Sequence, residues 1–226
     1  MVRNIDMFGT ITHSSKGSSM KNIFILLITL LTCNNLIAQN IDLPAPQKTG
    51  GMPLMEALSK RSTIRAFDTT DISMQQLSNL LWASFGINRP DGKRTAPSAN
   101  NKQEIDIYVL LKQGAYIYDA KKNRLNQVIA EDIRNQATER RFAEAPVQLI
   151  FIADFAKRMG NSEENNLRTA NIDCGYISQN TYLYCASEGL VTGARGTVKR
   201  DALISKLNLR PEQAIILAHS VGHPKP

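Results

Sequence analysis

The sequence predicts one α+β domain in which helices flank a central, mostly antiparallel sheet. Two observations lead to this class. Segments whose apolar residues recur at helical spacing are mixed with short apolar runs typical of strands, and the two kinds do not alternate strictly. The chain also shows no internal repeat, and its 226 residues are enough to bury a core.

The predicted domain begins with two helices that flank an arginine-rich stretch. Residues 52–60 have apolar residues at helical spacing and open with Pro53, where a missing N–H costs little. Residues 71–87 start at a capping Asp or Ser and stop at Gly86. The stretch between these helices, residues 60–68, reads KRSTIRAFD. It therefore places two arginines and two hydroxyl residues just beyond a helix end.

The middle of the chain predicts a long polar loop followed by strands. Residues 88–103 contain turn formers, hydroxyls and amides, and a loop of this length in a compact domain is usually functional or disordered. The segments after it read as a strand at 104–112, a hairpin at 115–125, a helix around 128–142 and a strand buried on both faces at 146–154.

The last third of the chain predicts one long helix and two further strands. We expect the helix at 163–188, a strand entering a glycine-bent loop at 190–198, a short helix at 199–208 and a final strand at 214–224. Cys174 and Cys185 lie about 16 Å apart along the long helix, too far for a disulfide, and are expected to be core residues. His219 is expected to be a hydrogen-bonded core residue of the final strand.

The N-terminal segment has the build of a secretory signal peptide. Residues 20–38 have a Lys after a Met, an apolar run at 23–31 and a small residue at Ala38. The run is shorter than the roughly 20 residues that span a bilayer. We therefore expect residues 1–19 to be an upstream tail, residues 39–51 a linker and residues 52–226 the domain of an exported, periplasmic protein. Lipid anchoring through Cys33 is the less favoured alternative.

Charge and motifs narrow the class of function. The net charge of +7 is spread along the chain, which does not fit a nucleic-acid footprint and suits a small anionic ligand better. The sequence has no GxGxxG after a strand, no HExxH, no CxxC and no GxSxG. These absences leave dinucleotide-fold, zinc-peptidase, dithiol and serine-hydrolase readings without support.

Four stretches, taken in order, resemble the nitroreductase-like family of FMN-dependent oxidoreductases. They are KRSTIRAFD, TAPSANNKQ before a strand, GARG after the long helix, and SVGHPKP near the end. The resemblance covers residues 54–224 and implies the nitroreductase fold. Residues 80–110 are similar to the branch that includes the thiazoline and oxazoline oxidases of peptide maturation, although Asn100, Asn101 and Glu104 depart from its pattern.

The resemblance implies how this chain would hold FMN. Arg61, with Ser62 or Thr63 beside it, would bind the phosphate, because a guanidinium fork and hydroxyl donors suit a dianion. Arg65 would face the N1 and C2 carbonyl edge of the ring, where a cation stabilises the reduced flavin. A weaker candidate for that edge is Arg141.

The same resemblance assigns three further contacts. Pro97, Ser98 and Asn101 match a loop that contacts the flavin from the other subunit, which implies a homodimer. Residues 194–196 (Ala194, Arg195 and Gly196) match a segment over the flavin, where a backbone N–H approaches N5 and small residues allow that approach. The side chain of Arg195 is read either as a contact for an anionic substrate or as a surface charge. Lys225 matches a basic residue of the phosphate site.

The expected function is two-electron hydride transfer through flavin N5, from a reduced nicotinamide, NAD(P)H, to a quinone, a nitro compound or a similar small acceptor. The resemblance implies no obligatory catalytic acid or base and no metal. Two alternatives stay open: an FMN-dependent oxidase or dehydrogenase with another donor, and an envelope protein that binds flavin without turnover.

Overall fold

The computed structural model describes residues 39–138, 140–157 and 162–226, without the side chains of Arg140 and Arg141. The expected signal peptide, the upstream tail and Cys33 lie outside these residues, and the side chain of Arg141 is likewise not described. The helices are α2 (Leu54–Lys60), α3 (Met74–Phe85), η1 (Ala99–Asn101), α4 (Arg134–Ala137), α5 (Arg140–Ala143), η2 (Phe155–Lys157), α6 (Glu163–Ser187) and α7 (Arg200–Leu207).

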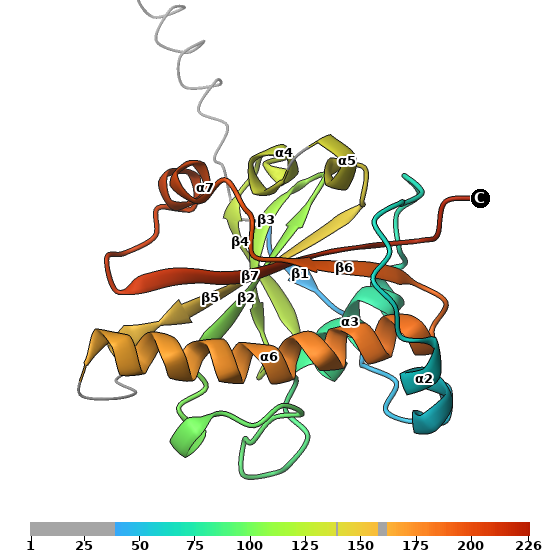
Figure 1. Cartoon of the computed structure of the whole chain (residues 1–226), viewed down its shortest axis with the longest axis horizontal. Helices are drawn as coiled ribbons and strands as arrows, with labels where there is room; N and C mark the ends of the chain where they lie inside the picture. Colours follow the sequence, from blue (N-terminus) through green and yellow to red (C-terminus); the bar gives the residue numbers. More distant parts are fainter. Residues whose placement is uncertain (1–38, 139, 158–161) are drawn as a thin grey trace, which may run out of the picture. The chain divides into compact units, whose positions relative to one another are not determined.

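One sheet forms the centre of the described chain (Figure 1). Its strand order is β1-β4-β3-β2-β5-β7-β6, and every pairing between these seven strands is antiparallel. The strands are β1 (Ile41–Asp42), β2 (Ile105–Leu111), β3 (Gly114–Asp119), β4 (Arg124–Ile129), β5 (Val147–Asp154), β6 (Val191–Arg195) and β7 (Gln213–Gly222). The α+β class with an antiparallel sheet is confirmed.

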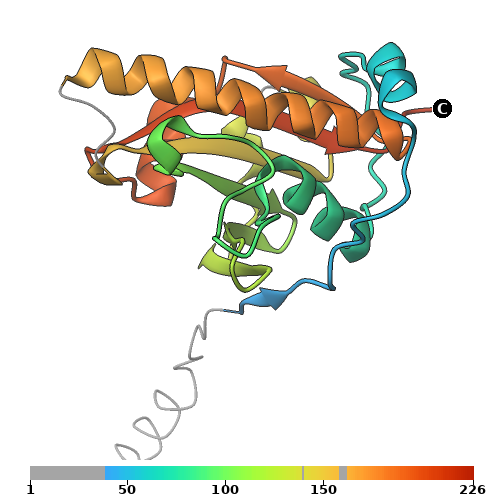
Figure 2. The same ribbon diagram turned by 90° about the horizontal axis from the view of Figure 1, so that it is seen from below.

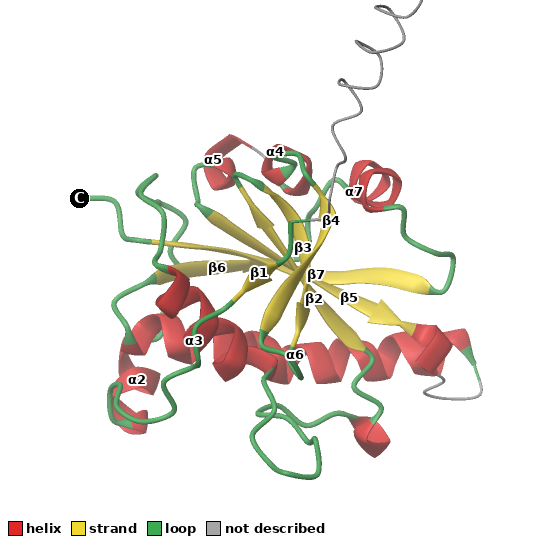
Figure 3. Cartoon of the chain, turned by 180° about the vertical axis from the view of Figure 1, so that it is seen from behind, coloured by secondary structure: helices red, strands yellow, loops and turns green. Residues whose placement is uncertain are grey.

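Helices cover both faces of this sheet, as Figures 1 and 3 show. Alternate residues of β2 point to opposite faces because the side-chain period of a strand is two. Ile107 and Val109 pack with α3 and α6, whereas Tyr108 and Leu110 pack with residues of α4 and α7. The central strands are therefore buried from both sides, and β5 is buried at every position.

Local signals explain where the two largest helices begin. Ser73 caps α3 by accepting the Gln76 N–H, while the Gln76 side chain accepts the Ser73 N–H, so both ends of a capping box are made. Ser162 caps α6 by accepting the Asn165 N–H. The cysteines Cys174 and Cys185 of α6 are buried free thiols in the described chain, as expected.

Two stretches differ from the sequence prediction. The helix expected around 128–142 is wrong in part, because β4 continues to Ile129 and two helices of four residues each, α4 and α5, follow. The side chain of Asp132 accepts the Arg134 N–H at 3.1 Å and so forms a turn between β4 and α4. In the expected linker at 39–51, Ile41 and Asp42 form β1 beside β4, and Leu43 is buried.

Candidate functional site

The arginine stretch is an extended segment, 61–65, that leaves the end of α2 and lies against β6. The Ile64 N–H donates to the Thr192 carbonyl at 3.0 Å. A Cβ at Gly193 would stand 3.1 Å from the Ile64 carbonyl oxygen, closer than ordinary contact. The glycine therefore allows the backbone of β6 to approach the segment, which a larger residue would push away.

The alternation of an extended segment separates its side chains. Ser62 and Ile64 line a cavity of about 170 Å³ between the segment and the end of α6. Arg61, Thr63 and Arg65 do not line this cavity. Of the two hydroxyl residues predicted beside the phosphate, Thr63 is therefore the one on the side of the arginines.

The two arginines of the segment carry uncompensated charge. Arg65 is exposed and Arg61 is half-buried. Within the described part of the chain, neither guanidinium makes a hydrogen bond or an ion pair, and Arg61 contacts the ring of Tyr182 at 5.2 Å from its centroid. Two cations without a counter-charge, beside a hydroxyl, form a suitable site for an anion.

Tyr182 of α6 connects this segment to β6 and was not recognised as a site residue from the sequence. Its hydroxyl lies 2.9 Å from Thr63 Oγ1 and accepts the Ala194 N–H at 2.9 Å. The hydroxyl thus holds two of the predicted site segments together. Tyr182 lies within the helix predicted at 163–188, and the sequence gave no signal of this contact.

The residues predicted over the flavin have different surroundings. Gly196 is exposed, and no described atom lies within 4 Å of where its Cβ would be. Arg195 is buried, and its guanidinium donates to Gln148 Oε1 at 2.7 Å and to Ser220 Oγ at 2.6 Å. Its side chain is therefore neither a surface charge nor directed to a ligand, and burial lowers the pKa of Arg195 to about 10.

Near the end of the chain, Lys225 makes an exposed ion pair with Glu144 at 3.6 Å. Such a pair is worth little in solution, so the Lys225 ammonium group remains available to a more strongly charged partner. Phe67, two residues after the arginine segment, pairs with Pro224 and is buried. The C-terminal residues therefore lie near the end of the arginine segment.

The loop that carries Pro97, Ser98 and Asn101 is held by many hydrogen bonds. The Ala99 N–H donates to Asp173 Oδ2 at 2.8 Å, and the Gln103 N–H donates to Ser98 Oγ at 2.9 Å. The side chain of Arg94 also donates to Gln103 Oε1 at 2.7 Å. Asn100, Asn101 and Gln103 have positive φ, a conformation that persists only where the surroundings enforce it.

Within one chain this loop and the arginine segment do not meet. The loop is anchored at Asp173 and the segment at Tyr182, both on α6. Nine residues of helix put these anchors about 14 Å apart along the axis and on opposite sides of it. Figure 2 shows α6 running past the loop and on toward the segment that follows α2.

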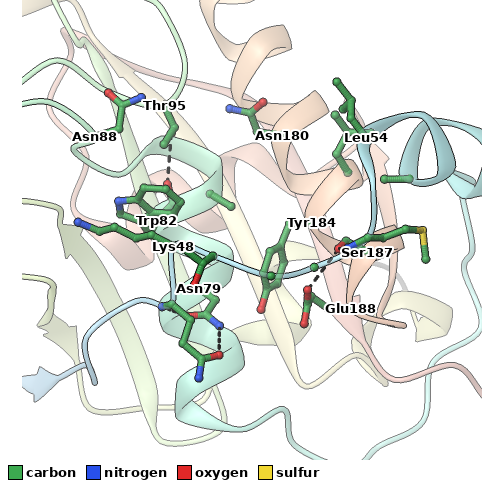
Figure 4. A pocket seen from close by; sticks show the side chains of 18 residues that line it. Lys48, Leu54, Asn79, Trp82, Asn88, Thr95, Asn180, Tyr184, Ser187 and Glu188 are labelled. Atoms are coloured by element: carbon green, nitrogen blue, oxygen red, sulfur yellow. Dashed lines mark hydrogen bonds between the residues drawn. The ribbon is translucent and has the colours of Figure 1, made fainter.

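A second concave region lies on the other side of α6 (Figure 4). It is a cavity of about 470 Å³ between the lead-in 47–52, α3 and α6, and it contains none of the residues predicted to bind FMN. Lys48 lies over the Trp82 ring at 5.6 Å, and the Asn79 side chain bonds to Gln47. Two polar side chains of this cavity are already hydrogen-bonded, since Asn79 Oδ1 accepts the Gln47 N–H and Ser187 Oγ accepts the Met52 N–H.

His219 is a core residue, as predicted. It is fully buried, with Ser178 Oγ 2.8 Å from Nε2 and Thr192 Oγ1 2.9 Å from Nδ1. Burial, helped by the nearby charge of Arg195, lowers the pKa of His219 to about 3. The imidazole is therefore neutral at physiological pH and stabilises the packing of α6 on β6 and β7.

Comparison with known proteins identifies relatives along most of the chain. The sequence model of the nitroreductase family matches residues 58–223. A protein of Methanocaldococcus jannaschii whose name assigns it to the nitroreductases is 27% identical over 175 residues, which are 73% of this chain and 88% of that protein.

Solved structures show the same fold. A Ralstonia eutropha structure described as a nitroreductase is 35% identical, covers 83% of this chain and 90% of its own, and has a TM-score of 0.78. A Staphylococcus epidermidis structure described as an NAD(P)H:FMN oxidoreductase is 15% identical, covers 80% of this chain and 92% of its own, and has a TM-score of 0.60. In the described residues, no helix combines the length and apolar character needed to cross a membrane.

Proposed function

Because the chain belongs to the nitroreductase family, we propose that it is an FMN-dependent oxidoreductase that passes two electrons from NAD(P)H to a quinone, a nitro compound or a similar small acceptor. The relatives named as nitroreductases and the one named as an NAD(P)H:FMN oxidoreductase support this class of reaction. When bound, FMN supplies the redox chemistry, so the residues of this chain bind and orient it.

The observation that carries the proposal is the uncompensated charge on segment 61–65. Arg61 and Thr63 offer a guanidinium fork and a hydroxyl to the phosphate, which carries nearly two negative charges. Arg65, four residues further, would supply a cation to the edge of the ring that gains negative charge on reduction. Gly193 lets the segment approach β6, and the open position at Gly196 leaves room for a flat ring beside the end of β6.

We further propose that the functional unit is a homodimer. Pro97, Ser98 and Asn101 are anchored on the opposite side of α6 from the arginine segment, so a second copy is the simplest way to bring the two together. On α6, Ile172 and Tyr176 are 51% and 48% exposed and lie one turn apart, on either side of the Asp173 anchor. Such exposed apolar side chains on one helix face suit burial against a partner.

Export is a separate part of the proposal. It rests on the composition of residues 20–38, which lie outside the described structure. Cleavage after Ala38 would leave the chain with Gln39, close to the start of β1. N-terminal sequencing of the cell-exported protein tests it: a start at Gln39 is expected, and an uncleaved cytoplasmic protein would contradict it. The azoline-oxidase branch stays a prediction.

The experiment for the activity is a visible absorption spectrum of the purified protein after FMN addition and gel filtration, recorded without oxygen before and after NADPH. We expect retained flavin bands that bleach on addition of NADPH. Retained bands that do not bleach would contradict the nicotinamide donor and favour another donor or a protein that binds flavin without turnover. Absence of flavin bands after gel filtration would overturn the proposed cofactor site.

A further inference from the structure

A buried carboxyl group lies at the base of the loop 97–103. Glu104 immediately precedes β2 and is fully buried, yet neither of its carboxyl oxygens has a hydrogen-bond partner among the described residues. Asp173 of α6 lies close enough for its charge to act on Glu104. Asp173 is 4% exposed and accepts the Ala99 N–H of the loop. Two carboxyl groups therefore share one water-poor site beneath a loop that one of them holds.

Physical chemistry restricts the charge of this pair. Burial of an ionised carboxylate without partners is costly, and two adjacent carboxylates cannot both ionise easily. Burial, which is the largest cause, and the charge of Asp173 together raise the pKa of Glu104 to about 7. The arrangement with the lowest energetic cost is therefore a protonated Glu104 whose O–H donates a hydrogen bond to Asp173.

The charged groups around Glu104 do not offer a better partner. Lys157 of η2, whose charge acts on Glu104, already donates to Asp106 Oδ1 at 3.0 Å and to the Gln103 carbonyl at 3.2 Å. Asp154 of β5 pairs with Arg210 at 2.6 Å. On α6, the thiol of Cys174 is buried, and burial raises its pKa, so this group stays neutral.

We propose that Glu104 and Asp173 share one proton, and that this pair positions the loop 97–103 by holding the acceptor of the Ala99 N–H. Glu104 is then a positioning residue that acts through Asp173 and touches neither FMN nor substrate. The consequence for FMN rests on the proposed function, in which Pro97, Ser98 and Asn101 contact the cofactor of the partner. The pairing itself does not depend on FMN.

The pair makes the loop sensitive to pH. A carboxyl with a raised folded-state pKa binds its proton more tightly in the folded than in the unfolded chain. Its contribution to stability is complete below the ordinary value of 4.5 and is lost as pH rises to about 7. Above pH 7 the charge of Glu104 repels Asp173, and the strained turns at Asn100, Asn101 and Gln103 lose their anchor.

The test compares wild type with Glu104→Gln, whose amide donates to Asp173 at every pH, in the purified protein without FMN. We expect an infrared carboxylic-acid carbonyl band at pH 6 that disappears in Glu104→Gln. By NMR, the protection of the Ala99 amide, corrected for intrinsic exchange, should fall about tenfold per pH unit above pH 7 in wild type only. Glu131→Gln, a change at an exposed ion pair with Lys206, is the matched control and should behave as wild type.

Two results would overturn the proposal: an unchanged carbonyl band in Glu104→Gln, or identical pH profiles of the Ala99 amide in wild type and Glu104→Gln. If Glu104→Gln does not fold, the wild-type infrared and exchange profiles alone decide, because loss of the band and of Ala99 protection must then coincide near pH 7. Failure of FMN to bind in a gel-filtration experiment would contradict the proposed function and leave this pair untouched.

If both proposals hold, the affinity for FMN gives a further readout. Between pH 7 and pH 8, the FMN affinity of wild type should fall by up to about tenfold more than the FMN affinity of Glu104→Gln. The comparison with Glu104→Gln removes the titration of the FMN phosphate itself, which is common to both proteins. Equal pH dependence of the two affinities, with the apo readouts as predicted, would show that the loop does not contact FMN.

Discussion

Arginine side chains have opposite roles in the arginine segment 61–65 and at the buried end of β6. Arg65 is exposed and Arg61 is half-buried, and their guanidinium groups have no hydrogen bond or ion pair within the described residues. Arg195 lies two residues beyond Gly193, which touches that segment, and donates to Gln148, Ser220 and the Ala137 carbonyl.

The difference shows that solvent exposure assigns the role of each arginine. A buried guanidinium loses its hydration and must recover hydrogen bonds from the protein, so Arg195 is committed to the fold. An exposed guanidinium keeps its hydration and its charge until an anion displaces the water. Three tests sharpen this contrast, and a fourth measurement tests its central claim.

The largest effect is expected from Arg195→Met. Because Gln148 and Ser220 would lose a charged donor in the core, the free energy of unfolding should fall by about 3 kcal/mol. Urea unfolding measures this, with Arg168→Met at an exposed position of α6 as the control that changes it by less than about 0.5 kcal/mol. Wild-type stability in Arg195→Met would show that the buried guanidinium contributes nothing net.

The next effect concerns His219, which lies beside Arg195. Its folded-state pKa of about 3 is below the ordinary 6.5, so the unfolded chain binds the proton first. Its contribution is complete above pH 6.5 and is lost as pH falls toward 3. Between pH 6.5 and 5 this loss should be about 2 kcal/mol. Acid unfolding of wild type and His219→Gln measures it, and parallel curves would refute it.

A smaller effect is expected from Tyr182→Phe. The change removes the hydroxyl that bonds Thr63 and the Ala194 N–H, so unfolding should become easier by about 1 kcal/mol. Amide exchange at Ile64 should also accelerate, because the segment loses a tether to α6. Arg168→Met, at an exposed position of the same helix, is again the control. Unchanged exchange at Ile64 would mean that β6 alone positions the segment.

Much of the fold could be predicted because its signals are local. The continuous apolar run of β5 and the 25-residue pattern of α6 both appear where the sequence predicts them. The stretch 128–142 could not be predicted, because β4 forms through pairing with β3 and its residues have no strong preference of their own. The pairing of Ile41 and Asp42 with β4 is likewise a contact between distant parts of the chain.

Some residues of the candidate site could likewise be predicted from the sequence, and others could not. Arg61 and Arg65 stand in a short motif, which the sequence alone reveals. Tyr182 lies 119 residues from Thr63 in the sequence, and Asp173 lies 74 residues from Ala99, so no local pattern connects them. The burial of Arg195 also depends on Gln148, 47 residues away. Roles that depend on such distant partners become visible once the chain is folded.

The most direct test of the account is the affinity for FMN of wild type, Arg61→Ala, Arg65→Ala and the control Arg168→Ala, measured by titration of flavin fluorescence. We predict about 10- to 100-fold weaker binding in each of the first two variants, from loss of a charge-assisted contact, and unchanged affinity in the control. Their unfolding should stay within about 0.5 kcal/mol of wild type. Arg61→Ala and Arg65→Ala proteins that hold FMN as tightly as wild type would contradict the account.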